Sequence, residues 1–269
     1  VKFLREAALD PEVISIKITI YRLSKISNVV SSLINAAKNG KKVLVQIELQ
    51  ARFDEANNIN HAEQLEAAGV KLIFGIQGLK VHSKIGVIEK RVNDKIKRFG
   101  FISTGNFNED TAKVYTDYTL FTSNRKLLKE VNKVFNFLEV PYKLKKYKHL
   151  IVSPHYSANT IERLIDNEIK NRLEGKTSGI QLKMNAITNY KLIDKLYEAS
   201  AAGVPIKMIV RGICCLIPGV KGLSEHIEVV SVVDKFLEHP RVYIFENGGE
   251  PKYYISSADF MTRNIENRV

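Results

Sequence analysis

The stretch Gly78-Leu-Lys-Val-His-Ser-Lys-Ile-Gly-Val-Ile88 reads as a turn that leads into a buried strand. His82 and Lys84 lie two positions apart, and because side chains alternate along a strand we expect both to project from one face. An imidazole beside a fixed cation can accept a phosphoryl group, since the imidazole attacks and the ammonium holds a phosphate oxygen. Taken alone, the motif favours the simpler interpretation of a partly buried histidine beside a solvated lysine.

The composition of the chain indicates a folded protein with a polyanionic partner. Its 269 residues are 45% hydrophobic, which suits one large domain or two medium ones. The net charge of +12 favours nucleic acid, an anionic membrane or a phosphate-rich substrate over a merely basic surface. The two cysteines, Cys214 and Cys215, are adjacent and fit a reducing, cytosolic setting. No apolar run of membrane-spanning length and no signal peptide is visible.

Strand and helix patterns alternate along the chain and predict an α/β fold. The basic segment 141–148 is the best boundary, so we expect domains at 1–148 and 149–269. The turn at 103–108 is rich in small polar residues and can present N–H groups to an anion. The expected strands are 13–21, 43–49, 70–74, the strand within 78–88 that carries His82, 99–103, 180–185, 206–210, 228–233, 241–245 and 252–255, and the expected helices are 29–39 capped by Asn28, 60–68, 124–138, 159–173 and 190–202.

The two halves of the chain repeat one order of features. Each has a strand, a helix stopped by glycine, a strand that delivers an arginine, a His-x-basic unit and a strand ending in small polar residues. Internal duplication of this kind predicts two similar α/β domains around a shared cleft that holds two histidines and several arginines. Chance similarity between two α/β halves is the alternative. The paired features are Gly40 and Gly203, Arg52 and Arg211, His82-Ser-Lys84 and His239-Pro-Arg241, and 102–106 and 255–259.

The duplicated His-x-Lys unit, followed by a strand and a Gly-Asn turn, resembles the phospholipase D superfamily. In that superfamily two such half-sites meet, and one histidine becomes a covalent phosphoryl carrier. This sequence departs from the pattern in two places. The superfamily's acidic position, five residues after the lysine, is Glu89, on a strand expected to run outward, and the second half has Arg241 in place of lysine.

A closer resemblance is to the C-terminal catalytic half of the bacterial polyphosphate kinase family, which builds inorganic polyphosphate from ATP. The family's N-terminal and helical domains have no counterpart here, and we expect the second domain to be truncated at its C-terminus. The resemblance implies a fold of two phospholipase D-like α/β domains. The family-like runs are Asp10–Ile14, Thr19–Arg22, Glu48–Glu55, Gly78–Lys84, Ser103–Asn106, Tyr115–Asp117, Lys183–Asn185, Val210–Cys215, Phe236–His239, Ser257–Asp259 and Arg263–Arg268.

The resemblance assigns a role to each matching position. The phosphohistidine falls on His82, with Lys84 beside it, and the second active-site histidine falls on His239. The family also associates Mg²⁺ with the positions of Arg22 and Arg52. Because a guanidinium cannot ligate a cation, we interpret these arginines as clamps on phosphate oxygens that carry the metal. The implied contacts to the phosphates of ATP are Tyr115, Arg211, His239 and Arg268.

The two histidines are expected to have different roles in phosphoryl transfer. The first half keeps its Gly-Asn turn, whereas the second half ends in Ala258-Asp259, which would add negative charge near a phosphate. A phosphoryl carrier needs surroundings that tolerate an anion, so we predict that His82 carries the group. His239 then stabilises the transferred group or moves a proton.

The expected partners are ATP, ADP and inorganic polyphosphate, with Mg²⁺ as cofactor and no nucleic acid. The resemblance further implies a homo-oligomer in the cytoplasm, with peripheral membrane association as an additional expectation. Two other functions stay open. One is a phosphodiesterase of the phospholipase D type, which uses the same histidine chemistry without ATP, and the other is a non-catalytic module that binds polyanions.

Overall fold

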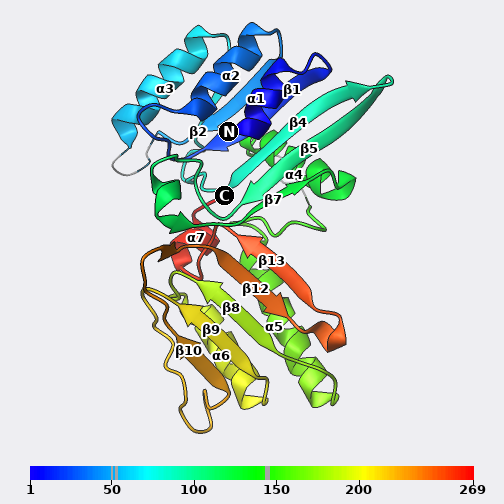
Figure 1. The fold of residues 1–269 in the computed structure, drawn as a ribbon. Coiled ribbons are helices and arrows are strands. Elements are labelled where there is room, and N and C mark those ends of the chain that lie inside the picture. The colour runs from blue at the N-terminus through cyan, green and yellow to red at the C-terminus, as the bar shows by residue number, and fades with distance from the viewer. Residues whose placement is uncertain (50, 52–53, 143–145) are drawn as a thin grey trace. The chain divides into compact units, whose positions relative to one another are not determined.

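The computed structural model describes residues 1–49, 51, 54–142 and 146–269. The chain forms two compact units, one of residues 1–113 with 119–150 and the other of residues 114–118 with 151–269. Each unit combines one main β-sheet with α-helices (Figure 1), which confirms the predicted α/β class. The domain boundary expected after Lys148 and the cleft expected between the halves stay predictions.

The first unit is built on a six-stranded sheet with the order β3-β2-β1-β4-β5-β7. Strands β1, β2 and β3 are parallel, and β4, β5 and β7 add an antiparallel edge. The strands are β1 (Val13–Ile20), β2 (Lys42–Ile47), β3 (Lys71–Phe74), β4 (Lys84–Val92), β5 (Lys95–Ser103) and β7 (Thr119–Thr122). The helices are α1 (Lys2–Leu9), α2 (Asn28–Lys38), α3 (Glu55–Ala67), the short η1 (Thr111–Lys113) and α4 (Arg125–Glu139).

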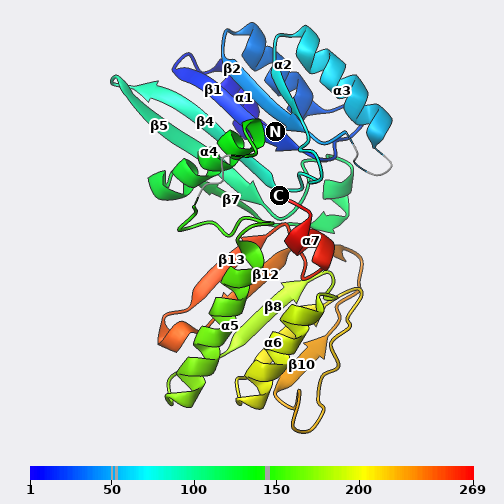
Figure 2. The same cartoon turned by 180° about the vertical axis from the view of Figure 1, so that it is seen from behind.

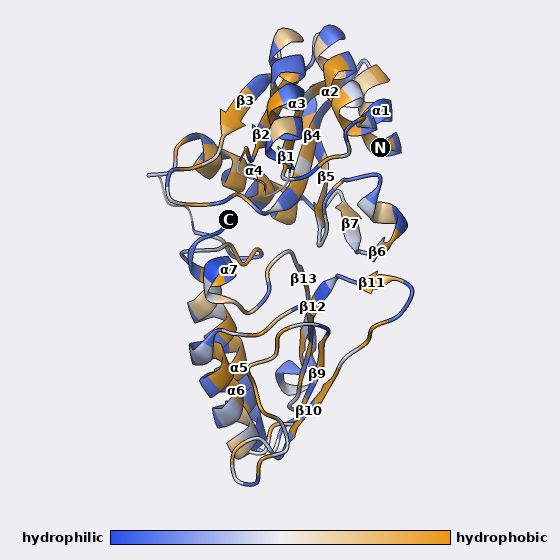
Figure 3. Cartoon of the chain, turned by 90° about the vertical axis from the view of Figure 1, so that its left-hand side faces the viewer, coloured by the Kyte–Doolittle hydropathy of each residue, from blue (hydrophilic) through white to orange (hydrophobic). Residues whose placement is uncertain are grey.

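Alternation along β1 places the helices of the first unit on both faces of its sheet. Ile16 and Ile18 are buried in the same core as residues of α1, α2 and α3. Between them, Lys17 points to the opposite face, where its Nζ donates to Asn132 of α4 at 2.9 Å. Hydrophobic residues accordingly follow the inner strands β1 and β2 (Figure 3).

The second unit is built on a five-stranded sheet with the order β10-β9-β8-β12-β13, and a separate two-stranded ladder joins β6 to β11. Two long helices, α5 (Ser157–Leu173) and α6 (Tyr190–Ala201), cover one face of the five-stranded sheet (Figure 2). The strands are β6 (Tyr115–Thr116), β8 (Ile180–Met184), β9 (Ile206–Val210), β10 (Ile227–Val230), β11 (Leu237–Glu238), β12 (Arg241–Phe245) and β13 (Lys252–Ser256). The helices are α5 (Ser157–Leu173), α6 (Tyr190–Ala201), the short η2 (Asn247–Gly249) and α7 (Thr262–Glu266).

The two sheets share one topology, which confirms the predicted duplication of the fold. In the first unit β1 pairs in parallel with β2 and antiparallel with β4, which in turn pairs antiparallel with β5. In the second unit β8 pairs in the same ways with β9 and β12, and β12 with β13. The basic residue of each His-x-basic unit faces a serine at the end of the next strand, Lys84 opposite Ser103 and Arg241 opposite Ser256.

Several predictions about local structure were wrong in detail. The strand expected to carry both His82 and Lys84 begins only at Lys84, so His82 lies in the connection before β4. The cap of α2 is Ser27, whose side chain accepts from the N–H of Val29, and Asn28 is the first residue of the helix. The sequence pattern does not predict helices α1 and α7, because each is short. Within the described residues, no helix is long and apolar enough to cross a membrane.

Candidate functional site

In the first unit, buried side chains hold the backbone on both sides of His82. The hydroxyl of Thr19 donates to the carbonyl oxygen of Ser83 at 2.6 Å and accepts from the N–H of Ile85 at 3.1 Å. On the other side, a carboxylate oxygen of Glu48 accepts from the N–H of Val81 at 3.0 Å. Thr19 and Glu48 are 1% and 4% exposed, so these bonds are shielded from competing water. The position of His82 is therefore set by the ends of β1 and β2.

The side chains around His82 form a compact aromatic and cationic group. The ring of Tyr21, the first residue after β1, meets the imidazole edge-to-face with 4.8 Å between the ring centroids. Lys84 is 2% exposed, and its Nζ lies 4.9 Å from the centroid of the same tyrosine ring. This Nζ also donates to the carbonyl oxygen of His82. Lys84 thus places a buried positive charge next to the histidine.

Replacing Thr19 with valine tests how His82 is positioned. Valine keeps the shape but leaves the N–H of Ile85 and the carbonyl of Ser83 without their hydroxyl partner, which should cost about 1–3 kcal/mol of unfolding free energy. Thr19→Ser, which keeps the hydroxyl, is the matched control and should lie much closer to the wild type. Denaturant unfolding of the three proteins gives the comparison, and equal stabilities of the valine and serine variants would contradict this account.

The other expected features of the first unit are Arg22, Arg52, Glu89 and the turn at 103–106. Arg22 follows β1, and its Nε lies 3.0 Å from a carboxylate oxygen of Asp54. Arg52 lies outside the described residues, so its predicted role stays a prediction. The turn at 103–106 is braced by the hydroxyl of Ser103, which accepts from Gly105 N–H at 3.3 Å. Glu89 accepts from Ser15 and Arg98 at 3.0 and 2.8 Å.

In the second unit, a short ladder brings an aromatic ring and a carboxylate to His239. Strand β6 runs parallel to β11, with Tyr115 opposite Leu237 and Thr116 opposite Glu238. The ring of Tyr115 therefore lies 5.1 Å from that of His239, measured between centroids. Asp117, just after β6, accepts from Nδ1 of His239 with distances of 2.9 and 3.1 Å to its two oxygens.

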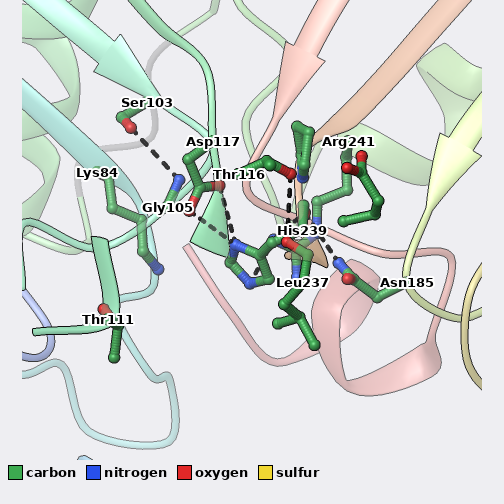
Figure 4. A network of polar contacts seen from close by, with 12 residues as sticks. Lys84, Ser103, Gly105, Thr111, Thr116, Asp117, Asn185, Leu237, His239 and Arg241 are labelled. Carbon is green, nitrogen blue, oxygen red and sulfur yellow. Dashed lines mark hydrogen bonds and ion pairs between the residues drawn. The ribbon is translucent and has the colours of Figure 1, made fainter. Parts of the chain in front are cut away.

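The hydrogen bonds of His239 define which ring nitrogen carries the proton (Figure 4). Nδ1 faces the carboxylate of Asp117, which accepts, so this nitrogen bears the hydrogen. Nε2 lies 3.0 Å from NH1 of Arg241, and because a guanidinium only donates, Nε2 is the acceptor. His239 is thereby held as the neutral Nδ1–H tautomer, with the lone pair of Nε2 directed at a cation.

Arg241 is itself held by a buried carboxylate. Its Nε and NH2 donate to the two oxygens of Asp259 at 3.1 and 2.9 Å, and both side chains are less than a tenth exposed. Burial would raise the pKa of the Asp259 carboxyl, but the adjacent guanidinium and the hydrogen bonds from Arg241 and Asn185 lower it overall. The negative charge expected near a phosphate is therefore balanced by Arg241.

Replacing Asp259 with asparagine should destabilise the second unit in a pH-dependent way. At about pH 7 the variant leaves a buried guanidinium without its counter-charge, a loss of about 3–5 kcal/mol. Since the folded pKa of Asp259 is below its ordinary 3.8, the stabilisation is full above that value and disappears as the pH falls through the folded pKa. Thermal unfolding from neutral to acid pH should show that the difference in stability between the wild type and Asp259→Asn becomes smaller below about pH 4. A difference that stays constant would contradict the pairing.

Arg211 and Arg268 are the remaining expected residues. Arg211 directly follows β9, and its Nε donates to Oδ1 of Asn185 at 2.5 Å. Arg268 follows α7 and is half-buried. Within the second unit the structure thus joins His239 and Arg211 through one polar network, which also includes Asp117, Asn185, Arg241 and Asp259.

Sequence reasoning gave no role to several residues that shape these sites. In the sequence these residues belong only to predicted strands or to family-like runs, and they are Thr19, Tyr21, Glu48, Asp117 and Asn185. The signal that was available is their position, because most of them lie at or just beyond a strand end, where α/β proteins place ligand-binding groups.

Residues that could hold Mg²⁺ directly are not gathered in the described part of the chain. Among the described residues, no group of three or more His, Cys, Asp and Glu side chains could hold a metal ion. Arg22, expected at a magnesium position, pairs instead with Asp54. A guanidinium offers donors only, so Arg22 does not fit a direct metal ligand.

Comparisons with known proteins cover the whole chain. The family model for polyphosphate kinase C-terminal domain 1 matches residues 1–145, and that for C-terminal domain 2 matches residues 150–269. Polyphosphate kinase of Escherichia coli K12 is 50% identical over 268 residues, which is all of this chain and 39% of that protein. The crystal structure of polyphosphate kinase from Porphyromonas gingivalis matches 99% of this chain and 44% of its own, with a TM-score of 0.89 and 40% identity.

A more distant likeness concerns the fold alone. Yeast tyrosyl-DNA phosphodiesterase matches 98% of this chain and 83% of its own with a TM-score of 0.56 and 8% identity. The class of protein is therefore an α/β protein with a duplicated, histidine-bearing unit. Within that class, the chain belongs to the polyphosphate kinase family, on both family models and the identity over its full length. It spans about two fifths of the length of the curated relatives that it matches.

Proposed function

We propose that this chain carries the catalytic domains of a polyphosphate kinase, with a first domain at 1–148 and a second at 149–269. The reaction is the reversible transfer of the γ-phosphate of ATP to the end of inorganic polyphosphate, through a phosphohistidine at His82. Family membership along the whole chain supports the reaction. The net charge of +12 supports a substrate that carries a negative charge on each phosphate.

The choice of His82 as carrier is supported by the hydrogen bonds of the other duplicated histidine. The lone pair of Nε2 on His239 accepts from Arg241, and Arg241 is fixed by Asp259. A nucleophile needs that lone pair to attack phosphorus, so His239 would first have to lose a buried, charge-assisted hydrogen bond. This hydrogen bond at His239 supports His82, the position that the family resemblance implies, as the phosphoryl carrier.

The proposed transfer takes place in two displacements. In the first, a ring nitrogen of His82 forms a bond to the γ-phosphorus while the bond from that phosphorus to the bridging oxygen breaks and ADP leaves. In the second, a terminal oxygen of polyphosphate attacks the same phosphorus and the N–P bond breaks. Lys84 offers nearby positive charge to the transferred group. The expected role of His239, to stabilise that group or to move a proton, would require the ring to give up one of its two hydrogen bonds.

Arginines and an aromatic residue complete the proposed ATP site. Arg22 and Arg211, with Arg52 and Arg268, would clamp phosphate oxygens, because a guanidinium matches the geometry of a phosphate edge. Tyr115 would contact the phosphates from its place beside His239. Mg²⁺ would arrive bound to the phosphates of ATP, where it would offset part of their negative charge. Oligomer formation and peripheral membrane association stay predictions, while two exposed cysteines without a disulfide support a cytoplasmic setting.

The test of the reaction uses the intact protein with γ-labelled ATP and a polyphosphate primer. A polyphosphate kinase forms labelled polymer, and with ADP and polyphosphate it forms ATP. A phosphodiesterase would instead hydrolyse a simple phosphodiester such as bis(p-nitrophenyl) phosphate without ATP. A polyanion-binding module would retain polyphosphate and consume no ATP. If the protein neither forms polymer from ATP nor forms ATP from ADP and polyphosphate, the proposal is wrong.

A further inference from the structure

Asn185 is the most fully connected polar residue of the second unit's network. It follows β8 and is 8% exposed. Its N–H donates to Asp259 at 2.7 Å, and its carbonyl accepts from the N–H of Gly212 at 2.9 Å. Its Nδ2 donates to Asp259 and to the carbonyl of His239, each at 3.2 Å, and its Oδ1 accepts from Arg211 at 2.5 Å. Every polar group of Asn185 therefore has a hydrogen-bond partner.

The contact with Asn185 fixes the plane of the Arg211 guanidinium. Within the described part of the chain, Nε is the nitrogen of Arg211 that has a hydrogen-bond partner. Binding at Nε restricts rotation of the planar group and leaves its two terminal nitrogens, the edge that suits a phosphate, for a ligand. An arginine held in this way before the ligand arrives loses less conformational entropy on binding.

The chain after Arg211 is held just as closely to Asn185. A Cβ at Gly212 would lie 2.8 Å from the carbonyl oxygen of Asn185, so only glycine allows this approach without a shift. Two further backbone hydrogen bonds join the segments that follow Asn185 and Arg211. The N–H of Ile187 donates to the carbonyl of Ile213 at 2.9 Å, and the N–H of Cys215 donates to the carbonyl of Ile187 at 3.0 Å. Arg211 thus has both its backbone and its guanidinium positioned by the segment that begins at Asn185.

Residue 185 must both accept and donate hydrogen bonds through its side chain, and a side-chain amide can do both. Oδ1 must accept from Arg211, while Nδ2 must donate to a carboxylate and a carbonyl. Aspartate would place a second carboxylate against Asp259 and lose both donations. The partners also fix which end of the amide is oxygen, since the reversed amide would turn an N–H toward the guanidinium.

We infer that Asn185 is a positioning residue that orients Arg211 for a phosphate group and ties it to His239. This inference rests on the proposed role of Arg211 as a contact to the phosphates of ATP. Asn185 touches no reacting atom in this scheme. Its effect passes through Arg211. Asp259 accepts hydrogen bonds from both Asn185 and Arg241 and so holds these two residues next to each other.

The test is a double-mutant cycle in the intact protein, read as KM for ATP and kcat for polymer synthesis. Asn185→Ala should raise KM for ATP about 5- to 20-fold, with a smaller change in kcat, and Arg211→Ala should raise KM at least as much. In the Arg211→Ala background, Asn185→Ala should add less than about 2-fold, since the residue through which it acts is gone.

Stability controls separate positioning from folding. Asn189→Ala removes the N-cap of α6, where Oδ1 accepts from Leu192 at 3.1 Å, and should lower thermal stability without changing KM for ATP. If Asn185→Ala fails to fold, Asn185→Ser is the second variant, because its shorter side chain can stay near Asp259 but cannot reach Arg211.

The outcomes distinguish the two proposals. If Arg211→Ala leaves KM for ATP unchanged, the proposed phosphate contact is wrong and the inference falls with it. If Arg211→Ala raises KM while Asn185→Ala and Asn185→Ser do not, Arg211 keeps its role and Asn185 loses the one inferred here. Fully multiplicative effects in the double variant would also overturn it, because they would mean that Asn185 acts independently of Arg211.

Discussion

His82→Ala is expected to abolish both phosphoenzyme formation and polymer synthesis, with polymer synthesis falling by more than about 1000-fold. The reason is that alanine has no lone pair to attack the γ-phosphorus, and the second histidine has its Nε2 engaged by Arg241. Thr19, Glu48 and the backbone they hold should be unaffected, because they bind the main chain around residue 82 and not its ring. The measurement is acid-labile label on the protein and label in polymer.

A matched control for this variant is His226→Ala. His226 is exposed and lies outside both sites, so the variant loses an imidazole without touching the proposed chemistry. It should form phosphoenzyme at the wild-type rate. Phosphoenzyme that persists at that rate in His82→Ala would mean that another residue is the carrier.

Asp117→Asn is expected to lower kcat by about 100-fold or more, in line with the loss seen when a carboxylate behind a catalytic histidine becomes an amide. His239 has Asp117 on one nitrogen and the guanidinium of Arg241 on the other. An amide that turns its NH₂ toward Nδ1 would give the ring donors on both sides, and a neutral imidazole cannot accept from both. The tautomer held in the wild type is then lost. The measurement is kcat together with the rate at which label reaches His82.

The controls for this variant ask whether Asp117 acts through His239. Asp234→Asn changes an exposed acid of the same unit and should leave kcat unchanged. His239→Ala should slow turnover yet still allow label to reach His82. Adding Asp117→Asn to it should change little, because the ring that Asp117 orients is missing. A further loss of similar size in the double variant would show that Asp117 has a separate role.

The duplicated α/β framework can be predicted from the sequence, because the signals for its strands and helices are local. Apolar alternation marks β1, β8 and β9, glycines mark the helix ends, and the His-x-basic unit recurs at the same place in each half. The topology confirms that these local signals describe a duplicated α/β fold. The apolar run continues through His82 and predicts that this residue lies on the strand. In the structure β4 starts only at Lys84.

The sites could be predicted only in part, because their side chains meet through contacts distant in the sequence. Asp117 and His239 are 122 positions apart and are joined by the two-residue ladder between β6 and β11. Strands this short have no periodicity to recognise. The sequence predicts that Asp259 adds negative charge near a phosphate, but its pairing with Arg241 depends on the register of β12 and β13.

The central claim, that His82 and not His239 carries the phosphoryl group, is tested most directly by locating the label. Intact protein is incubated with γ-labelled ATP and digested at alkaline pH with a protease that cleaves after glutamate, which keeps phosphohistidine intact. Residues 67–89 then form a peptide whose one histidine is His82, and residues 239–246 form a peptide whose one histidine is His239. We predict label in the first peptide and none in the second. Label in the peptide of residues 239–246, at a rate that matches turnover, would contradict the account.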